Sequence, residues 1–369
     1  MPLYQQEHLR DISQQFRIYG QILHAELCKI GHINETYTAT YDQGGVTVRY
    51  IHQKINQGVF KKPVEVMENV MRVTSHLQHK LRQNGTRQCT RRSLTVVPTH
   101  DGQPCYIDED GNYWRTFVYV ERVQSFESVQ TPAQAYEAGR AFGEFQSLVA
   151  DLPGERLHET IPDFHNTRKR FEALQQAIEA DAIDRARNCL PEIEFALAQA
   201  PWIDTLLDAH ARGDIPERIT HNDTKFNNVM LDWETGRAIC VVDLDTVMPG
   251  LVHYDFGDMI RTTTSSTMED EPDLSKVHLQ MPMFEALARG YVEAARDILT
   301  PAERQYLAFA GKLITFTIGI RFLTDYLQGD TYFRVHRPDH NLMRARTQFK
   351  LVRSIAEQEE RMQAFVNAL

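Results

Sequence analysis

A polar segment between two apolar runs carries the clearest chemical pattern in this sequence. His221, Asp223 and Asn228 follow the spacing His-x-Asp-x4-Asn and stand directly before a short apolar run at 229–231. After a turn, a second apolar run ends on Asp243. Two short strands joined as a hairpin would bring Asp243 back beside Asn228, with Asp223 nearby. The pattern therefore predicts two carboxylates and an amide grouped at one point.

These residue types suit the transfer of a phosphoryl group from ATP. A carboxylate such as Asp223 can orient the attacking hydroxyl and accept its proton. The amide oxygen of Asn228 and the carboxylate of Asp243 are hard oxygen ligands of the kind that Mg²⁺ prefers. Lys225 could reach the transferring phosphate. We therefore expect Asp223 and Lys225 to be catalytic, and Asn228 and Asp243 to hold Mg²⁺.

Two further aspartates compete for the metal. Asp245 follows Asp243 by two positions and is expected past the end of the strand, where it contacts the metal or the acceptor. Asp255 opens the tripeptide DFG, which is the metal motif of protein kinases. It lies beyond a Pro-Gly turn, at the start of a predicted helix. We expect Asp255 to cap that helix or to tether the catalytic loop by hydrogen bonds.

The elements that must position these residues change character along the chain. Strand patterns, with one helical pattern opening at Pro63, occupy 22–56, 94–97, 105–107 and 114–120. Helical patterns then dominate at 132–150, 164–180, 191–211, 279–297 and 301–328. This order predicts an α+β, bilobal chain, and the resemblance of residues 221–228 to the catalytic loop of protein-kinase-like phosphotransferases implies a protein-kinase-like fold. A small antiparallel β-sheet N-lobe with one helix would span 1–121, after an N-terminal helix, and a larger, mainly helical C-lobe would span 122–369.

A kinase-like N-lobe needs a cation for the nucleotide phosphates. Lys54 ends a predicted strand and is the best candidate for the α- and β-phosphates, against the alternative of an ordinary exposed strand-end lysine. Glu68, in the following predicted helix, is its expected partner, and Glu65 is the alternative partner. Lys29 and Arg49 are the other candidate cations.

The nucleotide would also contact two other segments of this lobe. Gly31, His32 and Asn34 precede the first hairpin, and a turn there could present backbone N–H groups to phosphate. Their spacing departs from the GxGxxG pattern of protein kinases. Residues 114–121 are expected to form the strand and hinge whose backbone holds adenine.

A polar cluster near the C-terminus is the candidate acceptor site. Arg321 and Asp325 are four residues apart and share a helix face, with Tyr332 close behind them. Polar groups beside an aromatic wall suit a hydroxyl-rich ring. Asp325 and Asp330 would also suit a cationic acceptor. The plainer alternative is a surface ion pair next to core aromatics.

Composition and charge narrow the class of protein. The 40 basic and 50 acidic residues give a net charge of −10, which argues against binding of nucleic acid through its phosphates. The five cysteines lack metal-ligand spacing and fit a reduced compartment. The longest apolar stretch, 306–323, is interrupted by Lys312 and Arg321, so it is expected to be a buried helix rather than a membrane span. The N-terminus shows no signal peptide, and the expected location is the cytoplasm.

Several motifs resemble those of a known family over nearly the full chain. They are Gly31-His32-Ile33-Asn34-Glu35-Thr36, Gln53-Lys54-Ile55-Asn56, the catalytic-loop run 221–228, Val242-Asp243-Leu244-Asp245 with the residues up to 250, and the C-terminal stretches 321–333 and 340–346. Together they resemble the aminoglycoside-phosphotransferase-like superfamily, which has a protein-kinase-like fold. Within it they are most similar to the N-acetylhexosamine 1-kinases.

This resemblance implies ATP- and Mg²⁺-dependent phosphorylation of GlcNAc or GalNAc at the anomeric hydroxyl. The alternatives within the superfamily are kinases of aminoglycosides, choline or homoserine-type acceptors. A catalytically inactive binding protein would lack Asp223, Asn228 or Asp243, and all three are present. A metal-dependent hydrolase would need His221 and His253 to converge with the aspartates.

Overall fold

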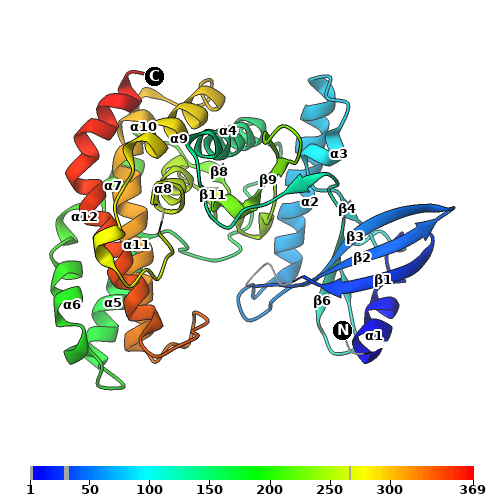
Figure 1. The fold of residues 1–369 in the computed structure, drawn as a ribbon, viewed down its shortest axis with the longest axis horizontal. Coiled ribbons are helices and arrows are strands. Elements are labelled where there is room, and N and C mark those ends of the chain that lie inside the picture. The colour runs from blue at the N-terminus through cyan, green and yellow to red at the C-terminus, as the bar shows by residue number, and fades with distance from the viewer. Residues whose placement is uncertain (1–2, 29–32, 266) are drawn as a thin grey trace.

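The computed structural model describes residues 3–28, 33–265 and 267–369. The chain forms a smaller lobe built on a β-sheet and a larger lobe built mainly of helices, which lie on opposite sides of Figure 1. This arrangement confirms the predicted α+β, bilobal, kinase-like fold.

The N-lobe is a twisted antiparallel sheet with strand order β1-β2-β3-β6-β4, in which β5 also pairs with β6. Its strands are β1 (Gln21–Leu27), β2 (Glu35–Gln43), β3 (Val46–Lys54), β4 (Val96–Val97), β5 (Tyr106–Ile107) and β6 (Tyr113–Val118). The turn between β2 and β3 uses Gly44 and Gly45, whose positive φ angles of 65° and 85° suit residues without a Cβ atom. Because successive side chains alternate between faces, one face of this sheet is turned to the C-lobe and the other to α1 (Leu3–Ser13).

The N-lobe contains more helix than the sequence predicts. Besides the N-terminal helix α1, it holds α2 (Pro63–Gln83) and a short additional helix, α3 (Cys89–Arg92). Val66, Val70, Val73 and Leu77 of α2 are buried in one core cluster, as their helical spacing predicts. α2 therefore covers the sheet face that is turned to the C-lobe.

The C-lobe is built mainly of helices. Its helices are α4 (Pro132–Val149), α5 (Thr167–Ala180), α6 (Leu190–Leu197), α7 (Thr205–Ala211), α8 (Val252–Thr263), α9 (Met281–Ala294), α10 (Pro301–Gln305), α11 (Leu307–Leu327) and α12 (His340–Asn367). Of these, α11 and α12 are the longest and pack against each other. The expected helical segment at 191–211 is two helices, because a 3-10 turn that contains Pro201 separates α6 from α7. α4 and α9 approach closely: a Cβ atom at Gly139 would lie 2.2 Å from the carbonyl oxygen of Leu287.

Helix α11 is the apolar segment that the sequence marks as a buried helix. By length and composition it is the one helix in the described chain that could cross a membrane, and most of its residues are buried inside the C-lobe. Its apolar surface packs against α5, α8 and α12 (Figure 1), so its hydrophobicity is explained by the core of the lobe.

A β-rich hairpin region joins the two lobes. It contains β7 (Val123–Gln124), β8 (Arg218–Thr220), β9 (Val229–Asp232), β10 (Ala238–Val241) and β11 (Met248–Gly250), together with the 3-10 turns η3 (Phe226–Asn228) and η4 (Leu244–Thr246). β9 and β10 form the predicted antiparallel hairpin. Beyond it, the amide N–H of Val242 donates to the carbonyl oxygen of Asn228 at 2.9 Å. This bond sets the metal-ligand candidate Asn228 beside the segment that carries Asp243.

Candidate active site

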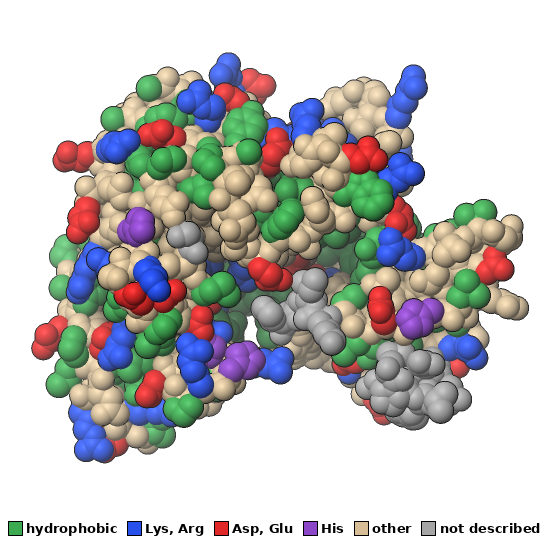
Figure 2. Space-filling view, in the orientation of Figure 1, with side chains coloured by type: hydrophobic (Ala, Val, Ile, Leu, Met, Phe, Trp, Pro, Cys, Tyr) green, Lys and Arg blue, Asp and Glu red, His purple; other side chains and the backbone are tan. Residues whose placement is uncertain are grey.

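The cavity that contains the candidate catalytic residues lies between the lobes, where Figure 2 shows the surface hollowed. Its volume is about 270 Å³. Residues from both lobes line it, including Asn34, Thr36, Gln53, Arg115, Asp223, Lys225, Asn228, Asp243 and Asp245. The sequence motifs of the two lobes therefore meet in one pocket.

The catalytic loop is held from below by helix α8. Asp255 accepts hydrogen bonds from the amide N–H groups of His221 and Asn222, at 2.9 Å and 2.7 Å. Asp258 accepts from the amide of Thr224 at 2.9 Å. The prediction that Asp255 tethers this loop is thus confirmed. Asn222 has a φ of 65°, a left-handed conformation that the two tethers stabilise.

Asp223 lies at the centre of the catalytic loop. The ammonium group of Lys225 is 3.0 Å from one carboxylate oxygen, and the amide of Asn228 donates to its backbone oxygen at 2.8 Å. Burial raises the pKa of Asp223, but the positive charge of Lys225 outweighs this effect, and the net shift is downward. The negative charge of Asp223 in turn raises the pKa of Lys225. Asp223 is therefore ionised at neutral pH and can accept a proton or orient a hydroxyl.

Asp243 carries the opposite shift. It has a φ of 60°, and its side chain is open to the pocket while the two lobes enclose it. This partial desolvation, followed by the negative charges of Asp245 and Asp223, raises the pKa of Asp243 to about 6. A carboxylate surrounded by other carboxylates is stabilised by a bound cation.

The residues present fit a divalent cation such as Mg²⁺. Within the described chain, no side chain or amide donates a hydrogen bond to the carboxylate of Asp243 or to the amide oxygen of Asn228. Both groups line the same pocket. Hard oxygen atoms that are open and free of other partners are the ligands such a cation requires.

A row of polar side chains crosses the N-lobe sheet on its cleft face and ends on Asp245. Gln53 donates to the hydroxyl of Thr36 at 2.9 Å and accepts from Nε of Arg115 at 3.0 Å. Arg115 forms a forked ion pair with Asp245, with one contact at 2.9 Å, and Asn34 donates to the same carboxylate at 2.7 Å. Both members of the ion pair are only 2% exposed. Asp245 is therefore a contact between the lobes, and its carboxylate is occupied by the N-lobe rather than by an acceptor.

Lys54 lies on the other face of the sheet. In the sheet, Lys54 of β3 lies opposite Glu35 of β2 on one side and Trp114 of β6 on the other. Its ammonium group is 3.0 Å from the carboxylate of Glu35. The predicted pair of Lys54 with Glu68 is therefore wrong, as is the alternative with Glu65.

The two glutamates of α2 have other partners. Glu68 accepts from His158 at 2.7 Å, and Glu65 is 2.8 Å from Lys62. Arg49, an alternative cation, pairs with Glu121 at the far end of its strand. Among the described residues that line the cleft pocket, Arg115 is the buried N-lobe cation. A lone arginine inside the strand 113–118, opposite Gln53, is the signal that could have identified it.

The predicted phosphate-binding segment is described in part. Gly31, His32 and Lys29 lie outside the described residues. Asn34 lies in the pocket, where its amide oxygen accepts from the backbone N–H of Asn56 at 3.0 Å while its NH₂ group donates to Asp245.

Part of the pocket lining is apolar, and this part is called the apolar slot. Its walls are Ile51, Val70, Leu94, Phe117, Val120, Met230 and Val242, next to the backbone of Val118 and Tyr119. A flat aromatic ring fits such a slot, and the backbone at 118–120 can supply hydrogen bonds. This is the segment in which the sequence predicts the adenine contacts.

The acceptor candidates lie at the end of α11. Arg321 is stacked over the rings of Phe164 and Phe333, at 5.0 Å and 5.4 Å, and its charge interacts with Asp223. Tyr332 is 58% exposed, and its hydroxyl is 3.5 Å from the guanidinium of Arg321. Arg321 and Tyr332 are therefore brought together, with Arg321 half-buried and Tyr332 open to solvent.

Asp325 has a different environment. It is buried, and its two oxygens accept from the backbone N–H groups of Thr331, Tyr332 and Phe333 and from the side chain of Asn341, at 2.8–2.9 Å. All of its capacity serves the loop that carries Tyr332. Asp325 is expected from the sequence to contact the substrate, but in the structure it holds the loop that carries Tyr332.

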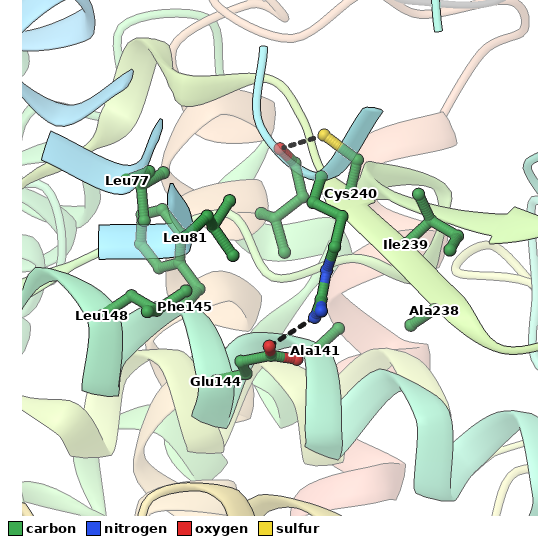
Figure 3. Close-up of a pocket in the computed structure, with 11 residues that line it drawn as sticks. Leu77, Leu81, Ala141, Glu144, Phe145, Leu148, Ala238, Ile239 and Cys240 are labelled. Carbon is green, nitrogen blue, oxygen red and sulfur yellow. Dashed lines mark hydrogen bonds and ion pairs between the residues drawn. The ribbon is translucent and has the colours of Figure 1, made fainter. Parts of the chain in front are cut away.

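A second cavity, drawn in Figure 3, lies away from this chemistry. It is about 30 Å³ and is bordered by Leu77 and Leu81 of α2, Phe145 and Leu148 of α4, and β10. An ion pair between Arg92 and Glu144 crosses it. Apolar walls and paired charges make it a gap in the packing between α2 and α4.

The histidines do not assemble a metal centre in the described part of the chain. His221 donates from Nε2 to the carbonyl oxygen of Val242 at 2.9 Å, while His253 is bonded to the carbonyl of Glu303 at 2.9 Å. The convergence of His221 and His253 that a hydrolase would need is absent among these residues.

Asp223, Lys225 and Asn228 on one loop lie beside Asp243 in a pocket that also has apolar walls, and these residue types suit phosphoryl transfer. Residues 24–296 match the model of the Phosphotransferase enzyme family, which is more than half of the chain. The protein belongs to this family.

Solved structures show the same fold over nearly the whole chain. A microcompartment-associated aminopropanol kinase is similar with a TM-score of 0.57 at 14% identity, covering 97% of this chain and 98% of that one. An aminoglycoside phosphotransferase from Alicyclobacillus acidocaldarius gives 0.57 at 12% identity, with 97% and 94% covered. A choline kinase from Cryptosporidium parvum gives 0.55 at 12% identity, with 98% and 99% covered. At such identities the likeness is one of fold.

Proposed function

We propose that this phosphotransferase transfers the γ-phosphoryl group of ATP to the anomeric hydroxyl of an N-acetylhexosamine, GlcNAc or GalNAc, in a Mg²⁺-dependent reaction. The observation that carries the phosphotransfer is the grouping of Asp223, Lys225, Asn228 and Asp243 in one pocket. The sugar acceptor is supported by the resemblance of residues 321–333 to the N-acetylhexosamine 1-kinases and by the charge of the acceptor end.

The residues of the pocket divide the work of transfer. The apolar slot would hold adenine, and the side-chain oxygens of Asn228 and Asp243 would hold the metal. Bound Mg²⁺ would supply charge neutralisation along the phosphates. Asp223 orients the acceptor hydroxyl and takes its proton. The ammonium group of Lys225 lies at the carboxylate of Asp223, where it favours the negative charge of the transferred group.

The charge at the acceptor end separates sugars from amines. Arg321 lies within electrostatic reach of Asp223 and is stacked on aromatic rings, and the carboxylate of Asp325 is used by its own loop. A guanidinium donates hydrogen bonds to hydroxyl and carbonyl oxygens, and it repels an ammonium group. Asp330 is also engaged, in an ion pair with Arg185 at 2.6 Å. These contacts favour a neutral, oxygen-rich ring over an aminoglycoside, choline or homoserine-type acceptor.

An acceptor panel tests this proposal. ADP release from ATP and Mg²⁺ is measured with GlcNAc, GalNAc, glucose, choline, ethanolamine, homoserine and an aminoglycoside. We expect turnover above the acceptor-free rate with the N-acetylhexosamines. Turnover with the amines alone would assign the protein to the amine kinases. A chain that binds ATP without turnover of any acceptor would support an inactive binding protein.

A further inference from the structure

Two arginines beside the acceptor end lack acidic partners. Arg170 lies on α5 and Arg321 on α11. Arg170 donates from Nε and Nη2 to the carbonyl oxygen of Phe164, both at 3.3 Å, and Arg321 reaches the hydroxyl of Tyr332 at 3.5 Å. Within the described chain, no carboxylate lies within 4.0 Å of either guanidinium group. The negative charge of Asp163 acts on Arg170, but its carboxylate accepts a hydrogen bond from Asn166.

The two guanidinium groups also act on each other. Burial, followed by the positive charge of Arg321, lowers the pKa of Arg170 to about 10. Burial likewise lowers the pKa of Arg321. Phe164 contributes to both environments, with its carbonyl at Arg170 and its ring under Arg321. Arg168, which lies on the same helix as Arg170, does have an acidic partner: its Nε is 2.9 Å from the carboxylate of Asp204.

We propose that Arg170 and Arg321 form an oxyanion subsite at the acceptor end of the active site. Two partly desolvated cations without counter-ions repel each other, and a bound oxyanion removes that repulsion while using their free N–H donors. Guanidinium groups present donors in a planar fork that matches phosphate or carboxylate oxygens. The negative charge of Asp223 also acts on Arg321, so the subsite lies within electrostatic range of the proposed base.

The same oxyanion chemistry has two sources in a sugar kinase. One is the phosphoryl group of the sugar 1-phosphate, after the anomeric oxygen has formed its bond to phosphorus and the bond to ADP has broken. The other is a carboxylate carried by the acceptor, as in a uronic acid. The subsite itself stands without the proposed sugar, whereas the first source rests on the proposed function.

Binding of inorganic phosphate tests the subsite without any activity. Titration calorimetry is performed on the whole chain with ADP filling the nucleotide slot. We expect Arg170→Gln to weaken phosphate binding about tenfold or more, as the loss of a charged hydrogen-bond donor implies. The phosphate affinity of Arg170→Lys should fall between those of the wild type and Arg170→Gln. Arg168→Gln, which removes a paired arginine from the same helix, should bind phosphate as the wild type does.

Thermal stability separates the subsite from a structural role. Arg170→Gln removes a repelling charge together with the hydrogen bonds to the carbonyl oxygen of Phe164. A purely structural role therefore predicts a lower Tm with unchanged phosphate affinity, whereas the subsite predicts weaker phosphate binding at a Tm close to that of the wild type. Phosphate binding that is undetectable in the wild type, or equally weakened in Arg170→Gln and Arg168→Gln, overturns the proposal.

A kinetic arm identifies the source of the oxyanion. If the product phosphate occupies the subsite, Arg170→Gln raises the inhibition constant of the sugar 1-phosphate and leaves the KM of GlcNAc unchanged. If an acceptor carboxylate occupies it, the variant lowers kcat/KM for glucuronic acid more than for GlcNAc. Equal effects on all of these ligands overturn the subsite. Absence of turnover with any sugar, combined with Arg170-dependent phosphate binding, would contradict the sugar kinase alone.

Discussion

At the scale of single residues, Asp223 and Asp243 show how one pocket gives two carboxylates different properties. Asp223 has Lys225 at 3.0 Å and a lowered pKa, which suits a group that must be ionised to receive a proton. Among the described residues no lysine or arginine forms an ion pair with Asp243, and its pKa is raised to about 6. Asp223 therefore has the properties of a base, and Asp243 those of a metal ligand.

Asp223→Asn tests the assignment of the base. The amide keeps the shape of the side chain but cannot accept the proton, so kcat should fall by about 10²–10⁴-fold. ATP affinity, measured by fluorescence titration, should change little, because Asp223 is placed at the acceptor. Near-normal turnover in this variant would remove Asp223 from the catalytic role.

The raised pKa of Asp243 predicts a pH-dependent cost to stability in the metal-free protein. Its folded pKa of about 6 exceeds the ordinary value of 3.8, so the folded state binds the proton more tightly. The cost is fully present above the folded value and is relieved as the pH falls toward 3.8. Asp243→Asn should therefore raise Tm at about pH 8 and lose this advantage at about pH 4. Scanning calorimetry with a metal chelator present measures the Tm of the variant and the wild type at both pH values. An equal difference in Tm at the two pH values would contradict the raised pKa of Asp243.

Mg²⁺ titration separates Asp243 from Asp255. Asp243→Asn should abolish turnover or greatly raise the Mg²⁺ requirement, because it removes an open oxygen ligand. Asp255→Asn should mainly lower Tm, because Asp255 holds the amides of His221 and Asn222. A Mg²⁺ response that follows Asp255 would show that the metal site is misplaced.

At the scale of elements, the link between β6 and η4 joins the two lobes. The buried ion pair of Arg115 with Asp245 connects a strand of the N-lobe to the segment behind Asp243. Arg115→Leu should destabilise the protein by about 3–5 kcal/mol, because it leaves a buried charge unpaired. The double variant with Asp245→Leu should recover much of this loss. Urea denaturation of the two single variants and the double variant measures the coupling, and strict additivity would contradict a direct pair.

The elements also show what sequence can predict. The residues from His221 to Asp243 lie in one local hairpin, so their spacing alone brings Asp223, Asn228 and Asp243 to one pocket. The partner of Lys54 depended on which face of β3 it occupies, and a shift of one residue exchanges the faces. Gln53, its neighbour, points into the cleft instead.

Contacts between distant segments were beyond the sequence pattern. Arg115 and Asp245 are 130 residues apart, and nothing in the sequence around either residue links them. Asp325 shared a helix face with Arg321, but the fold of the following loop turned its carboxylate toward backbone amides. Helix α12 was also not predicted, because its charged surface hides the buried positions that pack on α11.

At the scale of the whole molecule, the two lobes enclose the pocket that contains Asp223, and we assign its apolar lining to the nucleotide and the region of Arg321 to the acceptor. The N-lobe supplies apolar walls and the buried Arg115, and the C-lobe supplies the catalytic loop and the arginine-lined acceptor end. The fold alone is shared with kinases of several acceptors. The identity of the phosphorylated atom is therefore the central claim that needs measurement.

NMR of the reaction product tests that claim most directly. The protein is incubated with ATP, Mg²⁺ and GlcNAc, and phosphorus–proton coupling is recorded on the isolated product, with Asp223→Asn as the inactive control. The account predicts a phosphate on the anomeric carbon, seen as coupling of phosphorus to the anomeric proton, in the wild type only. A phosphate on any other hydroxyl, or product formation with an amine acceptor and none with GlcNAc or GalNAc, would contradict it.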